Sequence, residues 1–242
     1  MLSRSEQDRY DRQIMINGFG LEGQEKLRNT RAFIAGAGGL GSPLAIYLTA
    51  AGVGSIKVVD CDVVGASNLN RQILHWNEDI GRQKVESAIE KLRKLNPDVE
   101  IKAVMEKITE TNIANLVADS DIIVDAMDNL PTRLLLNRIS LKKNIPLFHG
   151  AIHGFEGRAT TIIPHETACL GCIYKGAPPG EKFPVIGATP GIIACIQATE
   201  VIKYIVGIGN LLLGRLLVYD GLAMKFTEFS IKRDPRCEYC GN

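Results

Sequence analysis

The sequence has no excess of charge of either sign. Its 28 Lys and Arg residues nearly match its 27 Asp and Glu residues. A broad positive surface that would attract nucleic acid or an anionic membrane is therefore not expected. Any binding of phosphate has to come from a local group of residues.

Long apolar segments are also missing. The N-terminal stretch MLSRSEQDRYDRQ is charged throughout and lacks the apolar core of a signal peptide, so we expect a cytoplasmic protein. The most apolar region, residues 188–214, is interrupted by Gln197, Glu200, Lys203 and Asn210, which favours a buried helix over a membrane span. Repeats and low-complexity segments are absent, and 242 residues with 45% hydrophobic content predict a globular protein.

Strand and helix patterns alternate through the first 145 residues. Short helices are expected within residues 1–30, with a break at Gly23, and Thr109 is expected to cap a later helix. The expected strands are 31–36, 55–60, 99–104 and 121–126, and the expected helices are 40–50, 83–95, 109–117 and 131–143. This alternation predicts a parallel sheet with helices on both faces.

The second half has a different pattern. Strands are expected at 145–152, 156–164, 214–220 and 225–231, with one clear helix at 189–206. The fold class predicted is therefore α/β, a Rossmann-like and mostly parallel sheet extended by antiparallel strands in the C-terminal half. The loop 175–190 contains four prolines, and we expect it to be mobile.

A glycine-rich segment follows the first expected strand. Gly36, Gly38 and Gly41 form G-x-G-x-x-G at the start of a helix, and Asp60 ends the next strand. The first glycine allows a tight turn, the second lets phosphate approach the backbone, the third lets helix and strand pack closely, and the carboxylate binds ribose hydroxyls. The segment predicts nucleotide binding and leaves open whether the nucleotide is NAD or ATP.

Four polar residues follow Asp60 at the edge where such a sheet binds ligands. They are Asn68, Arg71, Gln72 and Lys84. A nucleoside triphosphate carries more charge at one end than a dinucleotide does, and the two cations could meet it. The alternative is that Arg71 and Lys84 are solvated surface cations.

Two acids end the fourth expected strand. Asp125 and Asp128 are expected to face the same crevice, and a carboxylate beside a polyphosphate commonly acts through Mg²⁺. The acids here therefore predict a magnesium site. The alternative for Asp128 is a helix cap ahead of Pro131.

Four cysteines occur in two C-x-x-C pairs. Cys169, Cys172, Cys237 and Cys240 match the ligands of a structural tetrahedral zinc site. Disulfides do not suit a cytoplasmic chain, and a redox dithiol lacks a thioredoxin-like context. The two other cysteines, Cys61 and Cys195, are expected to be small buried apolar residues.

These blocks together resemble the MoeB/ThiF/HesA family, prokaryotic relatives of the ubiquitin-activating enzymes. The resemblance covers almost the whole chain and is carried by RYDRQIMINGFGLEGQEKL, AGAGGLGSPLAIYLTAAGVG, DCDVVGASNLNRQ, GRQKVESA, DAMDN, both C-x-x-C pairs and GIIACIQATEVIKYIVG. It implies an adenylyltransferase that uses ATP to activate a carboxylate, usually the C-terminal Gly-Gly of a ubiquitin-like sulfur carrier such as MoaD or ThiS.

The resemblance also implies residue roles. The nucleotide would lie against Gly36, Gly38, Gly39, Gly41, Asp60 and Asp62, its phosphates would meet Asn68, Arg71, Gln72 and Lys84, and Asp128 would hold Mg²⁺. Arg12 resembles an arginine that reaches a neighbour's ATP, which implies a homodimer. The implied organisation is residues 1–30 at the dimer interface, 31–145 binding ATP, and 146–242 binding substrate and zinc.

The implied reaction needs charge neutralisation more than a general base. A C-terminal carboxylate has a pKa of about 3.5 and is already ionised at neutral pH. Its obstacle is repulsion from the triphosphate, which Arg12, Arg71, Lys84 and Mg²⁺ would offset. Pyrophosphate would leave and an acyl-adenylate would remain.

One departure from the family bears on the later steps. Several relatives carry a cysteine in the crossover loop, whereas here the loop reads KGAPPGEKFPVIGATPG. We therefore expect adenylation without an enzyme thioester. His149 and His153 are either strand-end histidines with ordinary hydrogen bonds or substrate contacts.

Three other functions stay open. Some relatives activate a small carboxylic acid, including a pyridinol acid of a hydrogenase cofactor. An NAD-dependent oxidoreductase would use the glycine segment but would leave Arg12, Arg71 and Asp128 without a task. A non-catalytic binding module would keep the fold and zinc alone.

Overall fold

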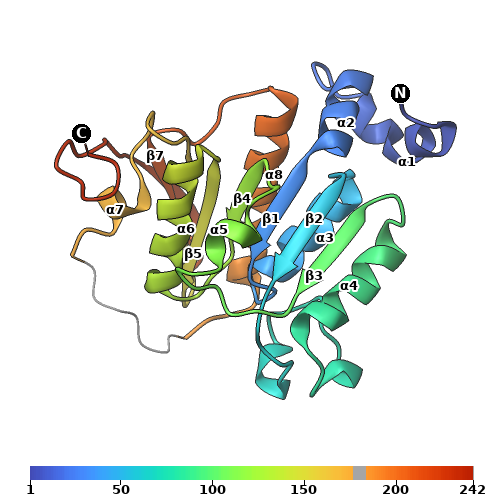
Figure 1. Ribbon diagram of the computed structural model, residues 1–242, viewed down its shortest axis with the longest axis horizontal. Helices are drawn as coiled ribbons and strands as arrows, with labels where there is room; N and C mark the ends of the chain where they lie inside the picture. Colours follow the sequence, from blue (N-terminus) through green and yellow to red (C-terminus); the bar gives the residue numbers. More distant parts are fainter. Residues whose placement is uncertain (177–183, 242) are drawn as a thin grey trace.

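The computed structural model describes residues 1–176 and 184–241, which build one eight-stranded sheet with helices on both faces (Figure 1). The strand order is β3-β2-β1-β4-β5-β6-β7-β8. Neighbours from β3 to β5 run parallel, and β5 to β8 pair antiparallel. The expected parallel sheet with an antiparallel C-terminal extension is confirmed.

The elements lie close to the positions expected from the sequence. The strands are β1 Arg31–Ala35, β2 Ser55–Val59, β3 Glu100–Val104, β4 Ile122–Asp125, β5 Leu147–His153, β6 Glu156–Ile162, β7 Arg215–Asp220 and β8 Lys225–Ser230. The helices are α1 Arg4–Ile14, α2 Gly20–Asn29, α3 Gly41–Ala51, α4 Lys84–Leu95, α5 Ile113–Leu116, α6 Leu130–Lys143, α7 Leu170–Ile173 and α8 Ala188–Val206, with short 3-10 turns η1 Ala66–Asn68 and η2 Asn77–Asp79.

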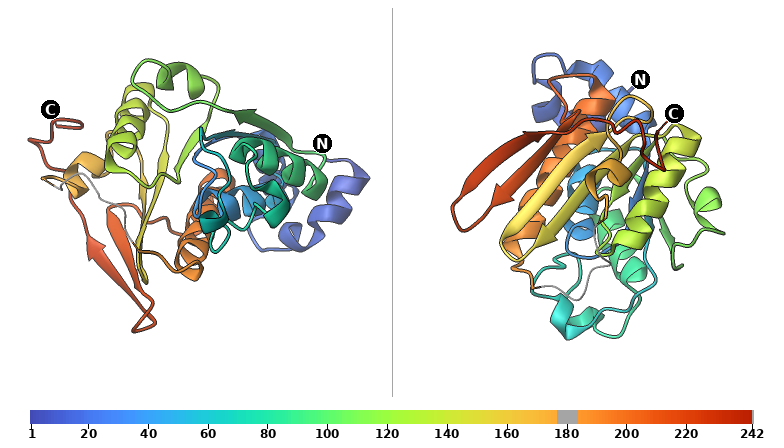
Figure 2. Two further views of the ribbon diagram at one scale, coloured as in Figure 1. Left: turned by 90° about the horizontal axis from the view of Figure 1, so that it is seen from below. Right: turned by 90° about the vertical axis from the view of Figure 1, so that its left-hand side faces the viewer.

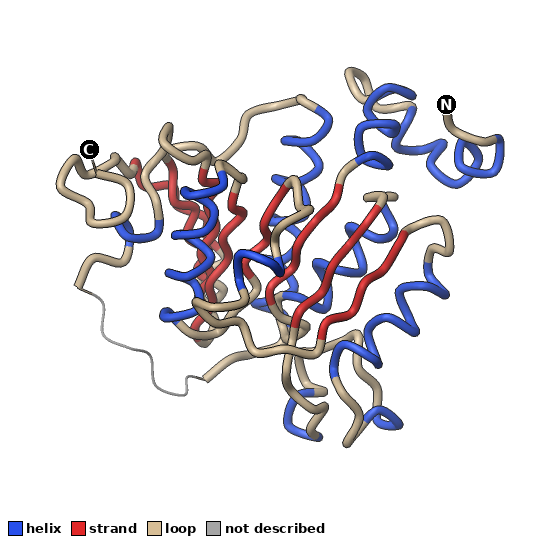
Figure 3. The backbone as a smooth tube through the Cα atoms, in the orientation of Figure 1, coloured by secondary structure: helices blue, strands red, loops and turns tan. Residues whose placement is uncertain are grey.

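The buried strand residues alternate between two cores. Ala32 and Ile34 of β1 pack into a core with α3, α4 and α8, whereas Phe33 and Ala35 point to the opposite core with α5, α6 and α7. Figure 3 shows helices on both sides of the strands. Because both faces of the central strands are covered, these strands are continuously apolar, as is usual for parallel sheets.

The strand order places a topological switch point between β1 and β4. From β1 the chain winds toward β2 and β3 on one side, and β4 and β5 lie on the other side. In open α/β sheets, ligands bind at such a point, beyond the carboxyl ends of the strands. The left view of Figure 2 looks from below at this edge, where the connection from β1 to α3 lies.

The helices α1 and α2 lie at the other end of the sheet (Figure 1). Side chains of α1 bond to the far ends of α3 and α4: Gln13 Nε2 donates to Ala51 O at 3.1 Å, and Arg9 Nη1 donates to Leu95 O at 3.3 Å. The expected break at Gly23 is wrong, because Gly23 lies inside α2. A Cβ there would come within 2.8 Å of Val206 Cγ1, so the glycine serves close packing of α2 on α8.

Two further elements differ from the expectations. The helix expected at 109–117 is the single turn α5, because the Asn112 side chain accepts from Thr109 N at 2.8 Å and holds a turn where the helix was expected to begin. Thr109 is therefore not a helix cap. The turn α7 between the two strand pairs was not expected. The prediction of a mobile loop at 175–190 falls mostly on residues 177–183, outside the described residues.

No helix in the described ranges 1–176 and 184–241 combines the length and apolar character that crossing a membrane requires.

Candidate active site and metal centre

The glycine segment forms a tight connection between β1 and α3. Gly36 has φ +101°, and a Cβ there would lie 2.9 Å from Ala126 O. At Gly41 a Cβ would lie 1.9 Å from Gly36 O, closer than any side chain can come. The first and third glycines are thus required by the turn and by the packing of α3 on the loop.

The middle of this segment offers hydrogen-bond donors. The backbone N–H groups of Gly38, Gly39 and Leu40 donate to no atom within the described part of the chain. At Gly38 the nearest atom to an added Cβ is Gln72 Nε2, at 3.6 Å. Free N–H groups before a helix N-terminus favour an anion, and phosphate is the anion that such loops bind.

Asp60 fastens the segment from the β2 side. Its Oδ2 accepts from Ala37 N and its Oδ1 accepts from Asp62 N, both at 2.8 Å. Each carboxylate oxygen can accept a second hydrogen bond. Asp60 can therefore hold the loop and still bind a hydroxyl group such as those of ribose.

Gln72 presents its side-chain Nε2 to the same region. Its side chain is buried, and Gln72 Oε1 has no hydrogen-bond partner among the described residues. A buried amide oxygen without a partner costs about 1–3 kcal/mol, whereas the amide N–H groups at Nε2 are donors that an anion at the loop could accept. Asn68 is occupied differently, since its Oδ1 accepts from Gly65 N at 3.0 Å.

The two cations near the loop differ in exposure. The Lys84 side chain is 7% exposed, and its Nζ donates to Asp62 Oδ2 at 2.8 Å. The alternative of a solvated surface cation is therefore wrong for Lys84. Arg71 is half-buried and folds back on its own segment, with Nη1 donating to Ser67 O at 2.8 Å and to Asn70 Oδ1 at 3.0 Å.

The two acids at the carboxyl end of β4 differ in burial. Asp128 is exposed, and the cap of α6 is Asn129, whose Oδ1 accepts from Thr132 N at 3.0 Å. The cap alternative for Asp128 is wrong, and its carboxylate is left available. Asp125 does not face a crevice, because it is fully buried and pairs with His149 Nδ1 at 2.6 Å.

His149 belongs to a buried hydrogen-bonded row rather than to an open strand end. Its Nε2 lies 2.8 Å from the hydroxyl of Tyr174, and its Nδ1 faces Asp125. Burial lowers the pKa of His149 despite the opposing effect of Asp125. His153 is exposed at the end of β5.

Two buried residues beside this row were missed by the sequence reasoning. Arg133 Nη2 donates to Met127 O at 2.6 Å, and Gln197 Nε2 donates to Asp125 O at 2.9 Å. Both tie helices to the loop that carries Asp128. Gln197 was visible in the sequence as a polar residue within an apolar stretch, whereas nothing in the sequence around Arg133 marks it as buried.

Arg12 lies away from the glycine loop of its own chain. It is exposed near the end of α1, and its side chain makes no hydrogen bond or ion pair within the described residues. The neighbouring Gln13 contacts Ala51, the last residue of α3, whereas the glycine loop precedes the first residue of the same helix. An 11-residue helix is about 16 Å long, so α3 separates the two regions.

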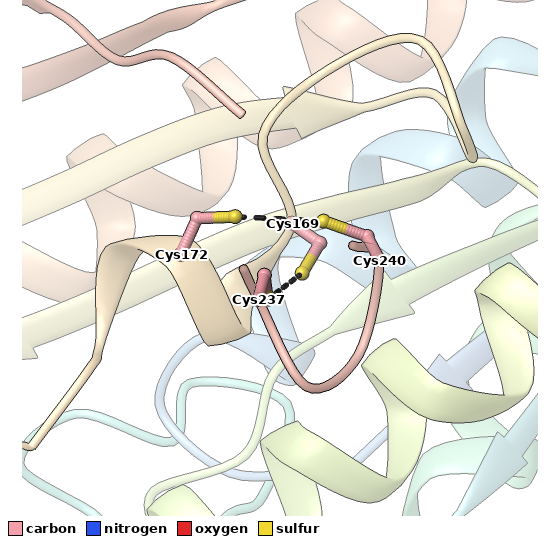
Figure 4. Close-up of side chains that lie close together, drawn as sticks. All are labelled: Cys169, Cys172, Cys237 and Cys240. Carbon is pink, nitrogen blue, oxygen red and sulfur yellow. Dashed lines mark hydrogen bonds between the residues drawn. The ribbon is translucent and has the colours of Figure 1, made fainter. Parts of the chain in front are cut away.

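The four paired cysteines converge on one point. Their sulfur atoms lie within 4.8 Å of one another, with Cys169 and Cys237 3.7 Å apart and Cys172 and Cys240 3.5 Å apart. Figure 4 shows the sulfur atoms turned toward one another, from α7 and from the C-terminal loop. Four thiolates around zinc at about 2.3 Å lie about 3.8 Å apart in a tetrahedron, so the cluster fits this ion.

The C-terminal segment is held at α7 by packing and by hydrogen bonds. A Cβ on Gly171 would come within 2.4 Å of the Tyr239 ring, so this ring lies directly on the glycine. Arg233 Nε donates to Cys240 O at 2.8 Å. These contacts bring together two cysteine pairs that are far apart in the sequence.

The remaining cysteines are exposed, contrary to expectation. Cys195 lies on the side of α8 away from its neighbours Ile193 and Ala194, which are buried. The apolar residues next to Cys195 in the sequence therefore did not imply that Cys195 is buried, because one side of the 19-residue helix α8 faces away from the sheet. Burial and the nearby Asp62 and Asp60 raise the pKa of Cys61.

The fold and the switch-point loop define a Rossmann-like α/β protein with the features of a nucleotide-binding site. Residues 10–239 match the ThiF family, and the chain belongs to this family. The family resemblance read from the sequence motifs is confirmed.

Characterised relatives cover nearly the whole chain. SAMP-activating enzyme E1 of Haloferax volcanii is 45% identical over 246 residues, spanning 99% of this chain and 91% of the relative. Sulfur carrier protein adenylyltransferase of Thermus thermophilus is 38% identical over 252 residues, spanning 99% and 93%. Protein HesA of Leptolyngbya boryana is 38% identical over 243 residues, spanning 100% and 88%. The relatives named adenylyltransferase agree with the enzyme class expected from the sequence.

Solved structures agree in fold. E. coli MccB with MccA-N7isoASN is 24% identical with a TM-score of 0.87, covering 100% of this chain and 76% of that one. PaaA is 25% identical with a TM-score of 0.82, covering 96% and 76%. These similarities support the sheet architecture.

Proposed function

We propose that this protein is a cytoplasmic adenylyltransferase that uses ATP to activate the C-terminal carboxylate of a ubiquitin-like sulfur carrier ending in Gly-Gly. The observation that carries the proposal is the group of unbonded N–H donors at Gly38, Gly39 and Leu40, placed at the switch point. The name of the Thermus thermophilus relative supports the choice of a sulfur carrier as substrate.

The site would bind ATP through charge and backbone donors. The phosphates would meet the loop N–H groups, Lys84 and Arg71, and Asp60 would bind the ribose. Gln72 Nε2, the side-chain atom nearest the loop, would donate to a phosphate oxygen. Magnesium, when bound, would neutralise phosphate charge, and the exposed carboxylate of Asp128 would hold it.

The ion pair between Lys84 and Asp62 has a specific role in this scheme. Burial of a lysine side chain without a partner is costly, and Asp62 compensates its charge before ATP arrives. The Asp62 side chain is 64% exposed and can move aside at little cost. Lys84 would then donate to a phosphate oxygen from a position already fixed at the start of α4.

The chemical step follows from these placements. The ionised tail carboxylate attacks the α-phosphorus, the bond from that phosphorus to the β-phosphate oxygen breaks, and pyrophosphate leaves with its electron pair. No residue has to remove a proton. The residues contribute by neutralising repulsion and by aligning the two anions.

A homodimer would complete the site. Arg12 is exposed and unpaired within the described residues and is separated from its own glycine loop by the length of α3. Arg12 of the partner subunit would therefore be the one that reaches the triphosphate. This proposal gives residues 1–30 a place at the dimer interface.

A complementation experiment tests the shared site. Arg12→Ala and Asp128→Asn are each expected to be inactive alone, and mixing them after joint unfolding and refolding is expected to restore about a quarter of wild-type activity. Half of the dimers would then contain one site with both residues intact. An Arg12 that acts within its own chain predicts no recovery on mixing.

The cysteine cluster is proposed to hold zinc in a structural role. Four thiolates close the coordination shell and leave no position for substrate. We further propose that no enzyme thioester forms, since the loop 175–190 lacks cysteine. The acyl-adenylate would pass directly to an external sulfur donor.

Exchange of labelled pyrophosphate into ATP tests the main proposal. Exchange is expected with a carrier ending in Gly-Gly, and it should vanish when the last glycine is removed. Asp128→Asn should abolish exchange, whereas Asp119→Asn, an exposed acid at the opposite end of β4, should not. Exchange with small carboxylic acids alone, and none with carriers, would overturn the proposed substrate.

A further inference from the structure

A buried row of hydrogen bonds leads from η2 to the glycine loop. Lys91 bonds to Asp79, and its Nζ also donates to Ser87 Oγ at 2.8 Å. Ser87 Oγ lies 2.9 Å from His75 Nδ1, and His75 Nε2 lies 2.9 Å from Ala37 O. His75 is 3% exposed, so no solvent competes for these bonds.

The donors and acceptors in this row follow from the carbonyl at its end and from a neutral His75. The carbonyl of Ala37 only accepts, so Nε2 of His75 carries the hydrogen atom. A neutral His75 with its hydrogen atom on Nε2 accepts at Nδ1, so the Ser87 hydroxyl donates there while its oxygen accepts from Lys91 Nζ. Burial lowers the pKa of His75 and outweighs the bond to Ala37 O, which raises it, so the ring is neutral at neutral pH.

The last bond fixes the orientation of one peptide unit. In a trans peptide the carbonyl of one residue and the N–H of the next point in opposite directions, and the described residues include no cis peptide bond. The carbonyl of Ala37 points toward His75, so the N–H of Gly38 points away from it. The N–H of Ala37 is held separately by Asp60 at 2.8 Å.

The orientation of Gly38 matters because its N–H has no partner in the described part of the chain. A rotated peptide would present a carbonyl oxygen, with its negative end, where an anion is to bind. Ser42 Oγ also donates to Ala37 O, but at the longer distance of 3.2 Å. His75 is therefore the stronger of the two restraints on this peptide.

We propose that His75 is a positioning residue for the polyphosphate of ATP, acting through the peptide between Ala37 and Gly38. This inference rests on the proposed function in taking ATP as the ligand. His75 does not touch the nucleotide; it holds the loop donor in the binding orientation, and Ser87 holds His75 in the required tautomer. If His75 only filled space in the core, its replacement would affect folding, and it would not weaken the binding of ATP more than the binding of adenosine.

Calorimetric titration of the full-length protein with ATP and with adenosine tests the inference. His75→Leu, which removes the donor but keeps apolar bulk, is expected to weaken ATP binding about tenfold. Adenosine binding should change less than about twofold, since adenosine lacks phosphates. His75→Gln, whose amide N–H can reach the same carbonyl, should recover most of the ATP affinity.

A matched control uses the same bond elsewhere. His165 Nε2 donates to Leu141 O at 3.1 Å, near the cysteine cluster and away from the glycine loop. His165→Leu should leave both affinities unchanged. Thermal unfolding of each variant identifies any that fail to fold, and in that case Ser87→Ala serves instead, with a smaller loss of about threefold for ATP and none for adenosine.

The outcomes separate this inference from the proposed function. Suppose that the wild-type protein exchanges pyrophosphate. If His75→Leu then leaves the affinities for ATP and adenosine unchanged, or lowers both equally, the positioning role alone is refuted. ATP binding that depends on His75 in a protein without exchange activity refutes the adenylation and supports the positioning role. A wild-type protein that binds no ATP refutes both.

Discussion

Replacing Asp79 by asparagine tests the buried charge that anchors the region behind the nucleotide site. The Asp79 side chain is fully buried and bonds to Lys91, Arg82 and the N–H of Trp76. Burial alone would raise the pKa of Asp79, but the hydrogen bonds from Lys91 and Trp76 N lower it to about 2. Because the pKa of Asp79 is lower in the folded state than in the unfolded chain, its carboxylate stabilises the fold at every pH at which the unfolded chain would also ionise it.

The size of the effect follows from linkage. A pKa of about 2 in the folded state, against 3.8 in the unfolded chain, corresponds to about 2 kcal/mol of stability above pH 5. Since the folded pKa is the lower one, this contribution is present above pH 4 and is lost as the pH falls toward 2, with about half lost by pH 3. Removing the charge also leaves Lys91, with a side chain 9% exposed, without its partner, so a loss of about 2–4 kcal/mol is expected at pH 7.

Urea unfolding followed by tryptophan fluorescence provides the assay. The chain has a single tryptophan, Trp76, and Lys91 Nζ lies 4.6 Å from its ring, so the signal reports on this region. The control is Asp121→Asn, because Asp121 pairs with Arg31 at the surface and should cost less than about 1 kcal/mol. A difference between wild type and Asp79→Asn that stays constant from pH 5 to pH 3, or one no larger than the control at pH 7, would refute the reasoning.

Three further predictions concern the cysteine cluster, the glycine loop and the buried tyrosine. Cys172→Ser should lower zinc content and thermal stability, whereas Cys195→Ser should change neither; equal zinc in both variants, measured by mass spectrometry, contradicts the assignment. Gly41→Ala should abolish ATP binding or folding, because its Cβ would lie 1.9 Å from Gly36 O, whereas Gly191→Ala in α8 meets no atom and should be tolerated. Tyr174→Phe should cost about 1 kcal/mol in urea unfolding, since it removes one buried hydrogen bond to His149; an unchanged stability would show that this bond contributes nothing.

The sequence was sufficient for the positions of the strands along the chain and for the residues at the ends of β1 and β2. Alternating apolar runs specify the elements, and the glycine spacing specifies the turn, because both depend on neighbours along the chain. The convergence of the four cysteines was also readable, since metal ligands come in recognisable pairs. The approximate ends of most helices agreed because capping and Pro or Gly signals are local as well.

The sequence could not predict the hydrogen bonds and the burial that depend on contacts between residues far apart along the chain. The bond from His75 to Ala37 joins residues 38 positions apart, and the burial of Asp125 depends on β5 and α8 packing beside it. The exposure of Cys195 follows from which side of α8 meets the sheet. In each case the residue type is compatible with several environments, and the tertiary packing selects one.

The unbroken hydrogen-bonded sheet from β3 to β8 has a consequence for motion during catalysis. Enzymes made of two lobes can close around a substrate by bending at a hinge, but a twisted sheet that runs under both halves of the site resists such bending. Shielding of a reactive mixed anhydride from water would then fall to the connecting segments beyond the strand ends. The rate of product release would then depend on movement of these connecting segments and not on movement of two lobes.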